Sequence, residues 1–261
     1  MPLRRRAVAA SLAFAAALCA APQARAECAL ALILALDVSG SVDPGEWNLQ
    51  RGGLASAFRT DDLQEAIAGI GGDLAVAVTQ WTGASRQHVS IGWTRLTSPA
   101  DVSAFADTLD AMPRRWRHFS TAIGEALIHA VELGRAAPPD CRRKVSDVSG
   151  DGESNEGVLP GAARASAAAE GWTVNGLAIA GAFPPVDRHY ERSVIIGELA
   201  FVEIADGFED YPRAILRKLL REIRADMNLS DAPPPPSPPA PSEALGADRA
   251  AHAPGRRRPP S

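Results

Sequence analysis

The sequence contains few residues of several kinds that mark particular classes of protein. Aromatic residues make up 5% of the 261 positions, and cysteine occurs only as Cys19, Cys28 and Cys141. Beyond residue 26, no apolar stretch reaches the roughly 20 residues that a membrane-spanning helix needs. The five histidines lack the paired spacing of a zinc site; they are His88, His118, His129, His189 and His252. We therefore expect no zinc cluster and no membrane span in the mature chain.

The first 26 residues resemble a secretory signal peptide. Three arginines (4–6) precede an apolar stretch over residues 7–21, and Ala24-Arg25-Ala26 has the small-x-small pattern of a cleavage site. We expect cleavage after Ala26, loss of Cys19 with the signal, and a periplasmic or secreted product. The four arginines removed leave 23 basic against 31 acidic residues, a formal charge of −8. An acidic chain without a basic stripe argues against nucleic acid as a partner.

The other end of the chain also has a composition unlike that of a folded domain. Residues 231–261 are dominated by Pro, Ala, Ser and Arg, including four consecutive prolines at 233–236. Such a segment buries too little apolar surface to offset its ordering entropy, so an extended tail is expected, with a Pro-rich ligand for a partner as the alternative. Residues 27–230 remain, enough for one domain.

Strand-like and helix-like segments alternate along these residues. Strands are expected at 29–36, 73–81, 87–96, 143–148, 172–180 and 200–205. Helices are expected at 44–68 with a break near 60–62, and at 98–109, 121–134, 160–170 and 211–224. The short polar link at 82–85 predicts a hairpin at a sheet edge. The alternation predicts a doubly wound α/β fold, with a mostly parallel six-stranded sheet, one antiparallel edge strand and helices on both faces.

Polar side chains gather where the carboxyl ends of the strands are expected. Asp37, Ser39 and Ser41 follow the first strand at alternate positions, and Gly40 allows the chain to curl there. Thr121 precedes a helix, and Asp151 follows the fourth strand. Ligands of such sheets bind at this edge, and oxygen ligands suit a hard divalent cation rather than zinc. The alternative is that the serines cap the next helix and Asp151 only turns the chain.

These motifs resemble those of von Willebrand factor type A domains. Asp37-Val38-Ser39-Gly40-Ser41 is similar to the family's Asp-x-Ser-x-Ser motif, "STAIGEAL" from Ser120 to the loop that supplies its threonine, and "SGDG" to its third element. The resemblance covers residues 28 to about 226, and it is closest to a bacterial exported subgroup known as a domain of unknown function. It implies a metal-ion-dependent adhesion site of Asp37, Ser39, Ser41, Thr121 and Asp151. Mg²⁺ is then the expected ion, with Mn²⁺ or Ca²⁺ as alternatives, and the expected partner is a protein that offers a carboxylate to it.

Two cysteines in an exported protein suggest a disulfide. Cys28 precedes the first strand and Cys141 the fourth, and the family's sheet order makes these strands parallel neighbours. The resemblance therefore implies a Cys28–Cys141 bond at the pole opposite the cation.

The sequence leaves some alternatives open. The interpretation is a binding protein rather than an enzyme, because the three loops offer no His or Lys as a base. A metal-dependent phosphohydrolase is the alternative, since the run that contains Arg114, Arg115, Arg117 and His118 could bind an anion. A metal-free scaffold is a third. Asp147, inside the fourth strand, needs a partner that the sequence does not identify.

Overall fold

The computed structural model describes residues 27–181 and 185–230. The expected signal peptide (1–26) and tail (231–261) lie outside the described residues. The six strands are Cys28–Asp37 (β1), Asp73–Trp81 (β2), Gln87–Leu96 (β3), Arg143–Gly150 (β4), Thr173–Ile179 (β5) and Val202–Ala205 (β6). The helices are Pro44–Arg59 (α1), Asp61–Ala68 (α2), Pro99–Asp110 (α3), Ile123–Gly134 (α4), Pro160–Ala169 (α5), Val186–His189 (α6) and Tyr211–Ser230 (α7).

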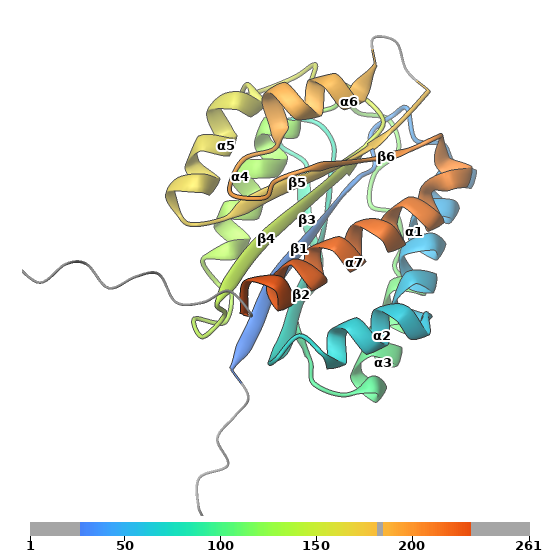
Figure 1. The fold of residues 1–261 in the computed structure, drawn as a ribbon. Coiled ribbons are helices and arrows are strands. Elements are labelled where there is room, and N and C mark those ends of the chain that lie inside the picture. Colours follow the sequence, from blue (N-terminus) through green and yellow to red (C-terminus); the bar gives the residue numbers. More distant parts are fainter. Residues whose placement is uncertain (1–26, 182–184, 231–261) are drawn as a thin grey trace, which may run out of the picture. The chain divides into compact units, whose positions relative to one another are not determined.

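The strands form one sheet in the order β3-β2-β1-β4-β5-β6. β1 pairs in parallel with both β2 and β4, and only β3, at the edge, is antiparallel to its neighbour. The sheet is covered by helices on both faces, as Figure 1 shows. This confirms the fold expected from the sequence.

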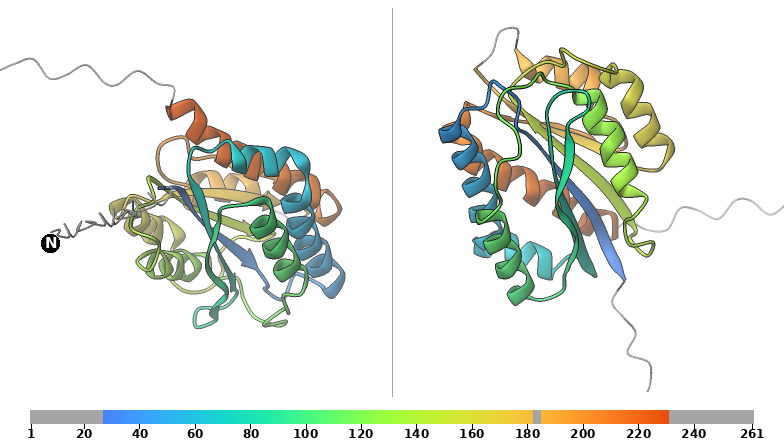
Figure 2. Two further views of the ribbon diagram at one scale, coloured as in Figure 1. Left: turned by 90° about the horizontal axis from the view of Figure 1, so that it is seen from below. Right: turned by 180° about the vertical axis from the view of Figure 1, so that it is seen from behind.

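The apolar pattern of β1 explains the two layers. Every residue of this strand is buried, and Leu32 and Leu34 belong to a core shared with α1, α2, α3 and α7. Their neighbours Ile33 and Ala35 point to the other face, into a core shared with α4 and α5. A strand buried on both faces needs the continuous apolar run that this sequence has. The two helix layers can be followed from below and from behind in Figure 2.

Several boundaries differ from the expected ones. β4 extends to Gly150, which pairs with Ala178 of β5, so Asp151 follows the strand directly. α7 continues to Ser230, and the segment from Val186 to Val194, for which no element was expected, forms α6 followed by a π-helical turn. Among the described residues, no helix is long and apolar enough to cross a membrane.

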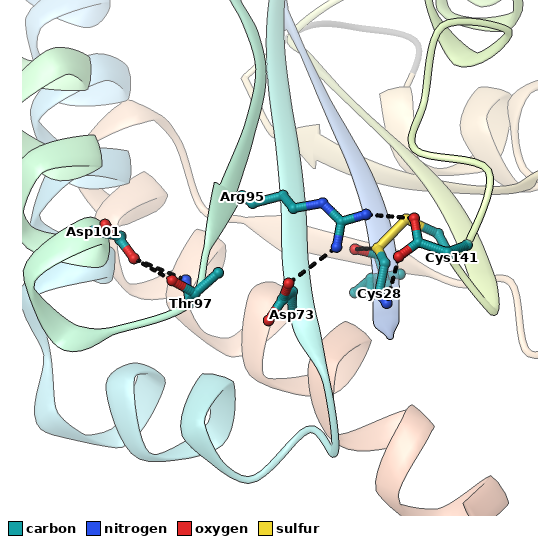
Figure 3. A network of polar contacts seen from close by, with 8 residues as sticks. Cys28, Asp73, Arg95, Thr97, Asp101 and Cys141 are labelled. Carbon is teal, nitrogen blue, oxygen red and sulfur yellow. Dashed lines mark hydrogen bonds and ion pairs between the residues drawn. A yellow bond between two sulfur atoms is a disulfide. The ribbon is translucent and has the colours of Figure 1, made fainter. Parts of the chain in front are cut away.

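A disulfide and an ion-pair network join the strands at the pole of their amino ends. Cys28 and Cys141 are bonded, with their Cα atoms 4.2 Å apart. Arg95 of β3 pairs with Asp73 of β2 at 3.0 Å and also with Asp140, whose second oxygen accepts the Cys28 backbone N–H at 3.3 Å. Figure 3 shows Arg95 reaching from its strand toward Asp73 and the disulfide. The bond therefore fastens the start of β1 to the start of β4.

This bond should contribute strongly to stability. Peptide mapping without reductant should recover Cys28 and Cys141 in one linked peptide. Cys141→Ser should lower the free energy of unfolding by up to roughly 4–5 kcal/mol, because the chain-entropy gain scales with the closed loop. Cys28→Ser should lower the free energy of unfolding by the same amount. The variant with both substitutions should lose no more, because the same single bond is removed. Two thiols that can be alkylated in the native protein would contradict the bond.

The partner of Asp147 is a buried lysine on α7. Lys218 Nζ lies 2.9 Å from Asp147 Oδ1 and 2.5 Å from Glu222 Oε1, and all three side chains are at most 1% exposed. Asn175 Nδ2 donates to the same Glu222 oxygen at 2.8 Å. Burial raises the pKa of Asp147, the charge of Lys218 lowers it, and that of Glu222 raises it. One lysine thus holds two carboxylates between α7 and the sheet.

Removing the charge of Lys218 should destabilise the domain far more than removing the charge of Asp147. At about pH 8, Lys218→Met should lower the free energy of unfolding by about 3–5 kcal/mol, because two buried carboxylates lose their counter-charge. The loss should shrink at about pH 5, since the Asp147 carboxyl, whose pKa is raised, then takes up a proton. Asp147→Asn leaves a matched Lys218–Glu222 pair and should have a much smaller effect. Urea unfolding at the two pH values measures this, and equal losses at both for Lys218→Met would contradict it.

Candidate metal centre

The first polar loop begins where β1 ends. Asp37 is the last residue of the strand, and Val38 N–H donates to Trp81 O of β2 at 3.0 Å. The helix that follows, α1, is capped by Asp43, whose side chain accepts the Glu46 N–H at 2.8 Å while Glu46 accepts the Asp43 N–H. The serines at 39 and 41 therefore do not cap this helix, which removes the simplest structural reason for them.

Three loops bring their oxygens together. Ser39 Oγ and Ser41 Oγ are 3.1 Å apart, and Ser41 Oγ donates to Asp151 Oδ1 at 2.8 Å. Thr121, only 5% exposed, lines the same cavity of about 580 Å³ as Ser41 and Asp151. A Cβ atom placed on Gly152 would lie 3.7 Å from Thr121 Oγ1, so Thr121 is close to the Asp151 loop. The structure thus brings Ser39, Ser41, Thr121 and Asp151 to one end of the sheet.

Asp37 is the buried member of the group. Its Oδ1 accepts the Ser39 N–H at 2.7 Å, whereas its buried Oδ2 accepts no hydrogen bond from any described residue. Burial, followed by the charge of Asp151, raises the pKa of Asp37 from 3.8 to about 7, although Ser39 and Arg114 oppose the shift. Burial also raises the pKa of Asp151. The charge of Asp151 thus disfavours the ionised form of Asp37, and a bound cation would stabilise both carboxylates as anions.

The loop before α4, which carries Thr121, is joined by hydrogen bonds to the loop after β4, which carries Asp151. Thr121 N–H donates to Asn155 Oδ1, and Asn155 N–H donates to Thr121 O, both at 2.9 Å. Ser154 Oγ accepts the Ile123 N–H at the start of α4 at 3.2 Å. The first loop joins them, because Gly40 N–H donates to Phe119 O at 2.8 Å. These contacts position Thr121 relative to Ser39 and Ser41.

Tyr190 is a site residue that the sequence did not identify. A Cβ atom on Gly150 would lie 2.6 Å from the Tyr190 hydroxyl and 2.9 Å from Asp37 Oδ2, so only glycine fits there. The hydroxyl is buried and has no hydrogen-bond partner among the described residues, and burial, with Asp37, raises its pKa well above the usual value. Tyr190 belongs to the segment after β5 for which no element was expected, and no signal in the sequence links it to Asp37.

The chemistry of the donor set fits a hard cation. The five predicted residues offer carboxylate and hydroxyl oxygens, as Mg²⁺, Mn²⁺ and Ca²⁺ prefer. Within residues 27–181 and 185–230, no group of three or more His, Cys, Asp or Glu side chains is placed to hold a metal ion. Any ion here would therefore depend on the hydroxyls as well as on Asp37 and Asp151.

The cavity beside this site is acidic. Glu46, Glu153 and Glu209 line it together with Asp151, and none of the described residues that line it is Lys, Arg or His. His189 reaches the Asp151 loop but accepts the Ser154 N–H at Nε2, at 3.4 Å. A phosphate group would meet negative charge on this side of the site.

Several solved structures share the fold. Proximal thread matrix protein 1 from the mussel byssus matches with a TM-score of 0.57 at 19% identity, over 75% of this chain and 48% of that one. Another structure of it, with a zinc-occupied MIDAS motif, matches with a TM-score of 0.54 at 19% identity, over 77% and 47% of the two chains. A von Willebrand factor type A protein from Catenulispora acidiphila matches with a TM-score of 0.52 at 14% identity, over 77% and 43%. The pilus adhesin SpaC from Lactobacillus rhamnosus GG matches with a TM-score of 0.53 at 14% identity, over 76% of this chain and 31% of that one.

These similarities show the fold alone, and this chain spans less than half the length of each of these proteins. None of the curated proteins compared matches it in sequence. A family described as "Protein of unknown function (DUF1194)" does match, over residues 27–227. The chain therefore belongs to the DUF1194 family, and its domain has the fold of a von Willebrand factor A domain.

Proposed function

We propose that this chain is an exported binding protein that holds a divalent cation with Asp37, Ser39, Ser41, Thr121 and Asp151. Through this ion it binds a carboxylate of a partner protein. Mg²⁺ is the expected ion, and Mn²⁺ and Ca²⁺ accept the same ligands. The proposed periplasmic or secreted location follows from the signal-like sequence at residues 1–26.

The observation that carries the proposal is the unsatisfied buried carboxylate oxygen Asp37 Oδ2. A buried charge without a partner is costly, and here a second carboxylate, Asp151, is joined to it through the hydrogen-bonded serines. A bound divalent cation would neutralise both. The five protein ligands would leave at least one coordination position of the ion open, which is the reason to expect a carboxylate from a partner.

The similar structures support the proposal in part. One relative in fold carries zinc in its MIDAS motif, and another is a pilus adhesin. A metal-occupied MIDAS motif and an adhesin are thus each found among proteins of this fold, and zinc belongs among the ions to be tested. The alternative, a phosphohydrolase, gains no support from the cavity, whose lining offers no basic side chain to hold a phosphate.

Asp37→Asn tests the site because it should raise stability without metal and remove the stabilisation by metal. Without metal, at about pH 8, the variant should be more stable than the parent by about 1–4 kcal/mol, because a carboxyl whose pKa is raised is ionised there at a cost. With Mg²⁺, the parent should gain thermal stability and the variant should not. Thermal unfolding with chelator and with Mg²⁺, Mn²⁺, Ca²⁺ or Zn²⁺ measures both.

Asp43→Asn is the matched control. It makes the same change of charge six residues further on, at an exposed helix cap where asparagine serves equally well. This variant should keep the full metal response. A metal-induced shift that survives in Asp37→Asn would overturn the site, and no shift with any of the four ions in the parent would indicate a metal-free scaffold.

A further inference from the structure

A run of arginines beside the metal centre has no role in the function proposed so far. Residues 113–120, here called the arginine loop, contain Arg114, Arg115 and Arg117 in a chain whose formal charge is −4. Arg115, Arg117 and the neighbouring Phe119 are exposed, and Phe119 as a whole residue is 38% accessible. A basic and partly apolar surface is thus presented next to the loop of Ser39 and Ser41.

The arginine loop is held rigidly to the scaffold. The buried side chain of Gln80 donates to Pro113 O at 2.9 Å and accepts the Arg115 N–H at 2.8 Å. At the other end, Thr82 Oγ1 donates to Ser120 O at 2.9 Å, and Phe119 O accepts the Gly40 N–H. A surface whose backbone is already ordered loses little entropy when a ligand binds.

The outward charges of this surface are not used within the domain. In the described part of the chain, Arg86, Arg115 and Arg117 form no ion pair with a carboxylate. The Arg86 guanidinium instead lies over the Phe119 ring, 3.6 Å from its centre. Arg114 points inward and donates to the backbone oxygens of Val38 and Ser39. Arg115 and Arg117 therefore remain available for carboxylates outside the domain, whereas Arg86 is shared with the Phe119 ring.

The sheet order gives the rim of the metal centre two sides of opposite charge. Trp81 and Thr82 at the end of β2, and Arg86 before β3, lie beyond one edge of β1, together with the arginine loop. β5 and β6 lie beyond the other edge, where Glu153 and Glu209 line the cavity. An acidic chain that reaches the cation meets attraction over the arginine loop and repulsion over the cavity.

We propose that the arginine loop, together with Arg86, is the docking surface for an acidic segment of the partner polypeptide. The segment would place one carboxylate at the cation and further carboxylates against Arg115 and Arg117, with an apolar residue against Phe119. The inference rests on the proposed function for the position of the first carboxylate. The arginine contacts themselves do not require the metal.

Binding of fluorescent poly-L-glutamate to the mature, disulfide-bonded chain tests this surface. Arg115→Gln/Arg117→Gln should weaken binding about tenfold, since each exposed charge pair contributes modestly. The loss should be similar with Mg²⁺ and with chelator, and it should diminish at high salt. Arg221→Gln/Arg224→Gln makes the same change on exposed residues of α7 near the amino ends of the strands, and it should leave binding unchanged.

The outcomes separate the two proposals. Equal binding by the parent and Arg115→Gln/Arg117→Gln, or an equal loss in the control, would overturn the docking surface. Dextran sulfate bound as tightly as polyglutamate at equal charge would also overturn it, because the surface would then be a general polyanion site. In a further outcome, Mg²⁺ strengthens polyglutamate binding neither by the parent nor by Asp37→Asn, yet Arg115→Gln/Arg117→Gln still weakens it. The proposed function then fails, and the docking surface is supported.

Discussion

The parallel pairing of β1 with both β2 and β4 is the constraint on which the rest of the structure depends. It forces the carboxyl ends of β1 and β4 to one edge, so Ser41 and Asp151 form a hydrogen bond although the chain separates them widely. It also brings the amino ends of the same strands together, where the disulfide closes. Only a strand buried on both faces can sit between two such neighbours, and its apolar run is what makes this possible.

The sequence predicts these features because each depends on a local pattern. Apolar runs mark the strands, and the motif at Asp37–Ser41 follows one of them. The length of β4 could not be predicted from the sequence, because Ser149 and Gly150 do not mark a strand. It is the pairing with β5 that keeps these two residues extended. The partner of Asp147 was hidden for a different reason. Lys218 and Glu222, four residues apart on a helix, look like a surface pair until tertiary packing buries them.

Asp37 and Asp147 present the same physical problem on opposite faces of the sheet. Each carboxylate is fully buried, and burial is the main cause that raises each pKa. The domain neutralises Asp147 with its own Lys218. Among the described residues, the only cation that lowers the pKa of Asp37 is Arg114, and its guanidinium donates to backbone oxygens instead. A structural carboxylate is thus given a partner within the chain, while Asp37 retains an unsatisfied oxygen beside the hydroxyls.

The distribution of charge around that oxygen determines from which side a ligand can approach. Glu153 and Glu209 repel an anion on the side of β5 and β6, and they raise the local concentration of cations there. Arg115 and Arg117 attract an anion on the side of β2 and β3. Charges at the rim of an interface affect orientation and association rate more than affinity. A single metal-bound carboxylate can rotate about its ion, so it is the asymmetry of the rim that gives a bound polypeptide one direction.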